Sequence, residues 1–113
     1  MTLLNAGKNR VRDILSTDIT TGECGTGTTA VALSDTDIET SVSGSQNDVS
    51  VSTADKQVTV DYVLTSVEGN GSAVTELGLW TNTDATLLSR FVFTSLVKSS
   101  TEEWQFSIIY KIV

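Results

Sequence analysis

The sequence lacks histidine and proline, has one cysteine, and contains no long apolar run. Without histidine, the usual Ser-His-Asp and Cys-His catalytic arrangements and the usual zinc sites are excluded. A single cysteine cannot form an intrachain disulfide, which excludes a disulfide-stabilised scaffold. A membrane-spanning helix needs roughly 20 consecutive apolar residues. The apolar runs here are far shorter, so we expect no membrane insertion.

Basic residues are also scarce, since the 113-residue chain has 7 basic and 14 acidic side chains and a net charge of −7. A surface of this sign opposes nonspecific binding to phosphate backbones, so we expect no nucleic-acid partner. Residues 1–12 include basic side chains without the apolar segment of a secretory signal, and no such signal is expected. The length suits one domain, residues 1–113, with one hydrophobic core.

Threonine and serine are abundant, with 18 and 14 residues. Such a composition is typical of β-rich proteins rather than helical bundles. The apolar fraction of 39% is high enough to argue against a disordered, mucin-like chain. The composition therefore predicts a folded, mainly β domain.

One helix is predicted, over residues 3–15, with Thr2 as its N-cap and Ser16–Asp18 as its end. Its apolar positions recur at spacings of three and four and line one face: Leu4, Gly7, Val11, and Ile14 or Leu15. Its other side is polar: Lys8, Asn9, Arg12 and Asp13. Because so short a helix is marginal alone in water, we expect it to dock on another element.

Charge is unevenly distributed along the chain. Lys8, Arg10 and Arg12 provide three of the seven basic residues, whereas residues 13–55 hold eight acidic residues and no basic one. The basic residues of the helix either form a solvated face or make a contact in an assembly. In the second case they would meet the acidic segment of the same chain or of a neighbouring copy.

After residue 16 the apolar period changes to two, which predicts strands over residues 58–65, 73–80, 87–93 and 104–112. Shorter strands are expected over 18–24 and around Val49 and Val51. The Glu68–Gly71 segment contains Asn-Gly, a strong turn signal, and the short connections favour antiparallel neighbours. Leu87, Phe91 and Phe93 are expected on one face of their strand. The predicted fold is a mainly β antiparallel sandwich, with a helix over residues 1–16 and a β-rich body over 17–113.

Two loop motifs have features of ligand sites. Gly25-Thr-Gly-Thr-Thr lacks the Gly-Lys-Ser/Thr ending of a phosphate loop, so we interpret it as a structural loop in which Gly25 and Gly27 supply backbone freedom. Alternating acidic residues resemble the start of a calcium loop: Asp35, Asp37 and Glu39. Thr40 and Gln46 occupy the positions of its required Gly and Glu, which excludes an EF-hand. A looser cation site shared with another copy and a solvated acidic turn both remain open.

Other side chains give weaker signals. Trp104 shares a face with Phe106 and is expected in the core, whereas Trp80 lies beside a turn and is a better candidate for stacking a sugar. A possible ligand surface combines Asn70, Trp80, Asn82 and Asp84. Cys24 is expected to be a small buried hydrophobic residue. No pattern pairs Glu76 with Glu102 or Glu103 for acid–base chemistry, so neither catalysis nor a cofactor is expected.

The order of segments resembles a family of small structural domains from tailed viruses, found in tail-fibre or baseplate-like proteins. Members typically show an Asn-x-Gly helix, a Gly-Thr-Gly-Thr-Thr loop followed by Asp-Thr, then Glu-x-Gly-Leu-Phe and a Leu-Leu-x-Arg-x-x-Phe strand. The matching positions cover nearly the whole chain: Asn5, Gly7, Gly25 to Thr29, Asp35, Thr36, Glu76, Gly78, Leu79, Leu87, Leu88, Arg90 and Phe93. Trp80 replaces the usual Phe, and Lys98 takes the place of a basic residue that usually follows the strand.

The resemblance implies a non-enzymatic virion structural protein that forms a homo-oligomer and contacts other virion proteins. A tail-fibre or baseplate position is favoured, and a head decoration or turret subunit is the alternative. A host-receptor or glycan-binding module is a third hypothesis, and the host is open between a bacterium and a haloarchaeon. From the residues themselves, Glu76 and Arg90 are predicted to form an ion pair between neighbouring strands that fixes their register.

Overall fold

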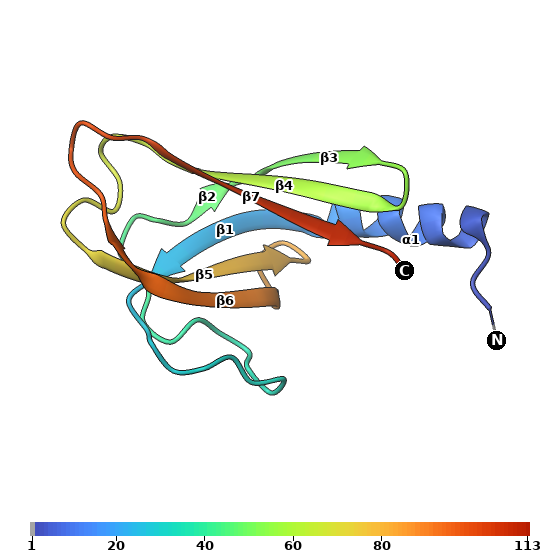
Figure 1. Cartoon of the computed structure of the whole chain (residues 1–113), viewed down its shortest axis with the longest axis horizontal. Coiled ribbons are helices and arrows are strands. Elements are labelled where there is room, and N and C mark those ends of the chain that lie inside the picture. The colour runs from blue at the N-terminus through green and yellow to red at the C-terminus, as the bar shows by residue number, and fades with distance from the viewer. Residues whose placement is uncertain (1) are drawn as a thin grey trace.

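The computed structural model describes residues 2–113, and it shows two antiparallel sheets packed face to face with one N-terminal helix (Figure 1). One sheet has the strand order β2-β1-β5-β6 and the other β3-β4-β7. The elements are α1 (Asn5–Asp18), β1 (Ile19–Gly25), β2 (Asn47–Asp48), β3 (Ser50–Ala54), β4 (Gln57–Leu64), β5 (Ala73–Thr81), β6 (Thr86–Val97) and β7 (Trp104–Lys111). The predicted fold class, a mainly β antiparallel sandwich with one helix, is confirmed.

The two long edges of the sandwich differ. On one edge the chain passes from β2 in the first sheet to β3 in the second through the single residue Val49, which packs against the core. On the other edge, β6 and β7 are the outermost strands of their sheets and do not pair with each other. The sandwich is therefore closed along β2–β3 and open along β6–β7.

The core follows the predicted alternation of side chains. In β4, every second residue is fully buried, namely Val58, Val60, Tyr62 and Leu64. They pack against Leu77 and Leu79 of the opposite sheet. In β7 the corresponding residues, Trp104, Phe106, Ile108 and Tyr110, are only half-buried. Because a side-chain period of two places alternate residues on one face, the half-burial shows that the inner face of β7 is incompletely covered.

Two expectations about the strands are wrong. The Asn-Gly segment forms the expected turn, but the strands on either side are not antiparallel neighbours, because β4 and β5 belong to different sheets and the turn carries the chain between them. Leu87 does not share the inner face with Phe91. Leu79 pairs with Ser89 but Trp80 pairs with Leu87, so a bulge at this point moves Leu87 to the outer face of the sheet, beside Gly78.

The helix begins and ends later than predicted, and it is rotated about its axis relative to the expected orientation. Leu4 is its N-cap, without a side-chain hydrogen bond, in place of Thr2. The hydroxyls of Ser16 and Thr17 donate to carbonyls three residues back, so these residues extend the helix instead of ending it. Of the expected apolar stripe, only Leu15 packs against the core. Gly7 of the stripe is half-buried, whereas Leu4, Val11 and Ile14 are exposed. Lys8, Asn9, Arg12 and Asp13 of the polar side are half-buried.

Candidate functional site

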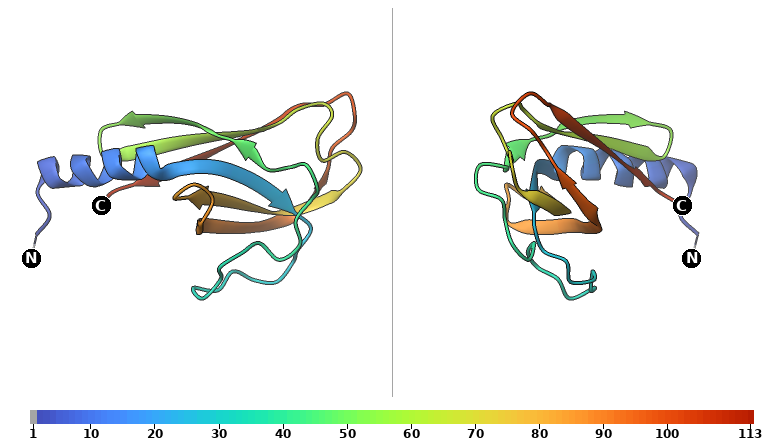
Figure 2. Two further views of the ribbon diagram at one scale, coloured as in Figure 1. Left: turned by 180° about the vertical axis from the view of Figure 1, so that it is seen from behind. Right: turned by 60° about the vertical axis from the view of Figure 1, so that its left-hand side comes forward.

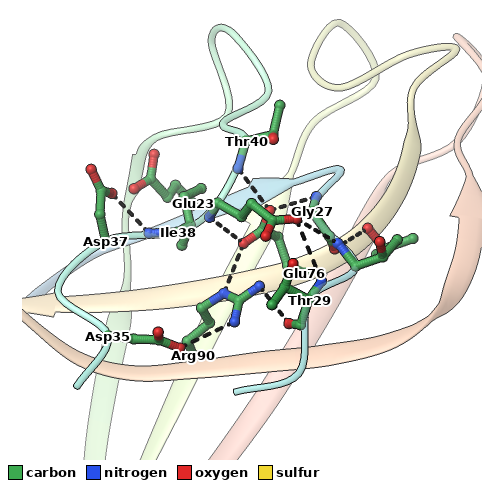
Figure 3. Close-up of polar contacts among 12 residues, drawn as sticks. Glu23, Gly27, Thr29, Asp35, Asp37, Ile38, Thr40, Glu76 and Arg90 are labelled. Atoms are coloured by element: carbon green, nitrogen blue, oxygen red, sulfur yellow. Dashed lines mark hydrogen bonds and ion pairs between the residues drawn. The ribbon is translucent and has the colours of Figure 1, made fainter. Parts of the chain in front are cut away.

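A long loop, residues 26–40, covers the outer face of the β2-β1-β5-β6 sheet, on the side away from β3, β4 and β7 (Figures 1 and 2). The strands beneath it place Glu76 of β5 and Arg90 of β6 on this outer face, with the loop above them (Figure 3). Both side chains are buried, Glu76 completely. This cluster of charged groups under a loop is the main polar site of the fold.

The Glu76 carboxylate accepts hydrogen bonds from three backbone N–H groups of the loop. Gly27 N–H donates to Oε2 at 2.5 Å, Thr40 N–H to the same oxygen at 2.9 Å, and Glu39 N–H to Oε1 at 2.8 Å. Burial by itself raises the pKa of Glu76, but the N–H donors of Glu39 and Thr40, with Arg90, lower it below its ordinary value. A buried backbone N–H group needs a hydrogen-bond acceptor, which a neighbouring strand or water usually provides. For these three N–H groups the acceptor is the Glu76 carboxylate.

Arg90 binds both Glu76 and the far side of the loop. Its Nε lies 3.0 Å from Glu76 Oε1, one Nη lies 3.2 Å from Asp35 Oδ2, and the other donates to the Thr29 carbonyl at 2.9 Å. Its hydrogen bond to Glu76 is the largest effect that raises the pKa of the guanidinium. A planar guanidinium with several fixed donors suits such a three-way contact.

The predicted Glu76–Arg90 ion pair is thus present in the structure. The two residues are not direct cross-strand partners, because Glu76 aligns with Val92 and Arg90 aligns with Gly78. Most of their hydrogen bonds reach the loop rather than the facing strand. We therefore interpret the pair primarily as an anchor for residues 26–40, and its role in strand register stays a prediction.

The glycines of the Gly-Thr-Gly-Thr-Thr loop serve a different purpose from the expected one. Neither Gly25 nor Gly27 has a positive φ. Instead, a Cβ at Gly27 would overlap the Glu76 carboxylate, and one at Gly25 would overlap the Thr40 carbonyl. Close approach of the loop to the sheet, rather than backbone freedom, requires glycine at both positions.

The acidic motif of the loop is used internally. Asp35 binds Arg90 and accepts from Ala32 N–H, while Asp37 accepts from Ile38 N–H. Glu39 accepts from the N–H groups of Thr28 and Thr29, and its hydrogen bonds with Thr29 and Thr28 lower its pKa. Within residues 2–113, no three His, Cys, Asp or Glu side chains are grouped to hold a metal ion. The structure gives no support to a cation site formed by Asp35, Asp37 and Glu39 within one chain.

The expected ligand surface is not brought together. Asn70 lies before the start of β5, whereas Trp80, Asn82 and Asp84 lie at its other end. The Trp80 indole N–H donates to Glu23 at 2.6 Å, and the Asp84 carboxylate accepts from the hydroxyls of Thr20 and Thr21. The expectation of one combined surface is therefore wrong, because most of the length of β5, residues 73–79, separates Asn70 from Trp80.

Two further side chains take the places expected of them. Trp104 packs against Phe106 with ring centroids 6.2 Å apart on the inner face of β7, as expected, but it is only half-buried. Cys24 is a fully buried free cysteine, and burial raises the pKa of its thiol. A buried thiol of raised pKa is a poor nucleophile, so Cys24 is a packing residue.

Sequence reasoning did not foresee the burial of Lys98. Its side chain is fully buried where the β4–β5 and β6–β7 connections meet, and its Nζ donates to Asn70 Oδ1 at 2.6 Å. The Asn70 amide in turn donates to the Ser66 carbonyl. The position of Lys98 in the resemblance was the only signal for it. The contact joins the two connections at this end of the sandwich.

The basic residues of the helix are divided between two environments. Lys8 and Arg12 lie on the half-buried side, where Arg12 forms an ion pair with Asp13 at 2.7 Å. Arg10 lies on the exposed side. Asp13 is the first residue of the acidic segment 13–55, so this ion pair joins the helix to that segment within one chain, whereas Asp35 of the loop pairs with Arg90.

The hollows of the surface are lined mainly by apolar side chains. One lies between the loop and β6, with a volume of about 330 Å³, and is lined by Val31, Leu33, Asp35 and residues 87–91. A second, of about 640 Å³, lies between β6 and β7 on the open edge of the sandwich. The charged residues that line the first hollow, Asp35 and Arg90, are bonded to each other.

Fold and site together define the class as an open antiparallel β-sandwich with a helical N-terminal arm and a loop anchored by a buried ion pair. No helix of residues 2–113 is long and apolar enough to cross a membrane. Comparison with protein-family models, with curated proteins and with solved structures finds no match.

Proposed function

We propose that this chain is a non-enzymatic virion structural protein of a tailed virus, which self-assembles in the tail-fibre or baseplate region. The proposal rests on the order of segments that resembles such domains. One observation supports it most: Glu76 and Arg90, the charged residues of that pattern, are buried and bonded within the chain. Groups used in this way stabilise a scaffold and are not free to bind a substrate.

The exposed features also suit assembly. Large apolar side chains are exposed on the helix, on the loop and at the end of β6 (Leu4, Ile14, Val31, Leu33, Leu96 and Val97). Exposed apolar groups that gather on defined faces mark contact surfaces between proteins. In a virion, many copies make each contact repeatedly, so modest contacts give stable assemblies.

Light scattering of the purified protein, in low salt and in molar salt, tests self-assembly. We expect a defined oligomer, such as a trimer, pentamer or hexamer, and its copy number separates a three-fold fibre or six-fold tail position from a five-fold head turret. A monomer in both conditions would exclude self-assembly. A glycan array is the companion measurement: specific binding through the β5–β6 turn would favour a receptor-binding module instead.

A further inference from the structure

The N-terminal helix exposes its apolar stripe. Leu4 is 72% exposed, Val11 42% and Ile14 54%, and these three residues lie at helical spacings that place them on one side. The residues on the side centred on Arg12, which include Lys8 and Asn9, are half-buried against the sandwich. An amphipathic helix normally buries its apolar stripe against its own domain, so the stripe of α1 lacks a partner within residues 2–113.

A second apolar surface lies on the open edge of the sandwich. The groove between β6 and β7 has a volume of about 640 Å³ and is lined by Phe91, Phe93, Leu96, Phe106 and Ile108. A smaller hollow continues it past Leu96, Trp104 and Phe106 as far as Glu103. We call the two together the β6–β7 groove. The core residues at its base are only half-buried, because the two sheets are not joined along this edge.

The helix of a chain does not cover the groove of the same chain. It packs on β1, β3 and β4, and it runs directly into β1 without a loop. Figures 1 and 2 show it extending from the sandwich along the β3–β4 hairpin, away from the connection between β6 and β7. Only the helix of another copy can bring the stripe to the groove.

The charges of the two surfaces are complementary. Residues 1–18 hold three basic and two acidic side chains, whereas residues 19–113 hold four basic and twelve acidic ones. Arg10 is exposed on the helix, and Glu102 and Glu103 are exposed at the end of the groove. A positive helix and a negative body attract each other, whereas identical positive helices repel.

We infer that the exposed stripe of α1 in one copy packs into the β6–β7 groove of the next copy. The inference deepens the proposed function and rests on it. The contact joins two different surfaces, so it is head-to-tail, and it builds a ring when the rotation from copy to copy closes. Each subunit gives one helix and receives one, and the apolar groups of both surfaces leave water together.

Two substitutions of exposed residues test the inference without disturbing the fold of the subunit. Ile14→Asp places a charge on the stripe, and Leu96→Asp places one in the groove, where Leu96 is 47% exposed. Ile109→Asp is the matched control, because Ile109 is 53% exposed on the outer face of β7. We expect Ile14→Asp and Leu96→Asp each to weaken association at least about tenfold, with Ile109→Asp unchanged and all three folded by circular dichroism.

Mixing the two variants gives the sharpest result. A Leu96→Asp copy still has a normal helix, and an Ile14→Asp copy still has a normal groove, so one contact per pair survives. We expect the mixture to form one-to-one dimers and no larger ring, measured by light scattering. Disruption by Ile14→Asp alone, with Leu96→Asp still fully oligomeric, would instead indicate a helix–helix bundle and overturn the inference.

Failure of the inference and failure of the proposed function give different results. If the wild type is oligomeric and both variants keep its mass, the assembly uses other surfaces and only the inference is overturned. If the wild type is monomeric in low and molar salt, self-assembly itself is excluded.

Discussion

Replacing Glu76 by glutamine removes the charge at the centre of the loop anchor. The new side-chain amide would turn an N–H₂ group toward backbone N–H donors and leave Arg90 without its closest carboxylate. Removing one partner of a buried ion pair costs about 3–5 kcal/mol. In a domain of this size 1 kcal/mol corresponds to about 4 °C, so we expect Tm to fall by about 12–20 °C at pH 7.

Two measurements locate the effect. Thermal unfolding by circular dichroism gives Tm, and native-state hydrogen exchange follows the amides of Gly27, Glu39 and Thr40, which should lose protection before those of β4. Glu103→Gln is the control, because Glu103 is exposed and the same substitution there should change stability by less than about 0.5 kcal/mol. A Tm within about 4 °C of the wild type, or unchanged exchange at the three amides, would refute the anchoring role.

The same carboxylate predicts a response to acid. The folded-state pKa of Glu76 is lowered, so the folded protein binds fewer protons than the unfolded chain near pH 4. Its contribution is complete above the unfolded pKa, which is about 4.3, and is lost as the pH falls through the lower folded value. The pKa of Glu68 is also lowered, by the backbone N–H of Thr65, so its contribution to stability is likewise lost as the pH falls. Tm should therefore drop between about pH 5 and 3, and less so in Glu76→Gln.

Three other perturbations test the remaining contacts. Gly27→Ala should destabilise by about 2 kcal/mol in urea unfolding, because its Cβ meets the Glu76 carboxylate, whereas Ala at the exposed Thr26 should have little effect. Lys98→Ala should cost about 1–3 kcal/mol, since the Asn70 carbonyl oxygen loses its donor, and an unchanged urea midpoint would contradict that contact. Cys24 should resist a thiol-reactive dye in the native state and react on unfolding, and fast native labelling would disprove its burial.

The strands could be predicted because burial of one sheet face imposes a period of two on the sequence. Val58 to Leu64 gave the position of β4 within one residue at each end. Their partners could not be predicted in the same way. The Asn-Gly turn has the same local chemistry whether it closes a hairpin or carries the chain to the opposite sheet, and the choice depends on how distant strands pack.

The charged pair could be predicted for a related reason. Glu76 and Arg90 interrupt apolar strands at positions that face the same side of neighbouring strands. Their main partners are backbone N–H groups of Gly27, Glu39 and Thr40, between 36 and 49 residues earlier in the chain. Backbone groups have no signature in the sequence, so the path of the loop over Glu76 could not be predicted from residue types.

The periodicity of the sequence could not predict which side of the helix faces the sandwich. The spacing of Leu4, Val11 and Ile14 defines a stripe but not the object that the stripe faces. In the structure, α1 ends where β1 begins, and Ile19 N–H donates to the Leu15 carbonyl while its own backbone is already extended. Because Ile19 is buried in the core, this loopless junction fixes the rotation of the helix and turns Leu15 toward the sandwich. Successive residues of a helix are about 100° apart, so Ile14 points outward as a direct consequence. The exposure of Ile14 is thus set by the junction, and any partner that covers it must come from outside the subunit.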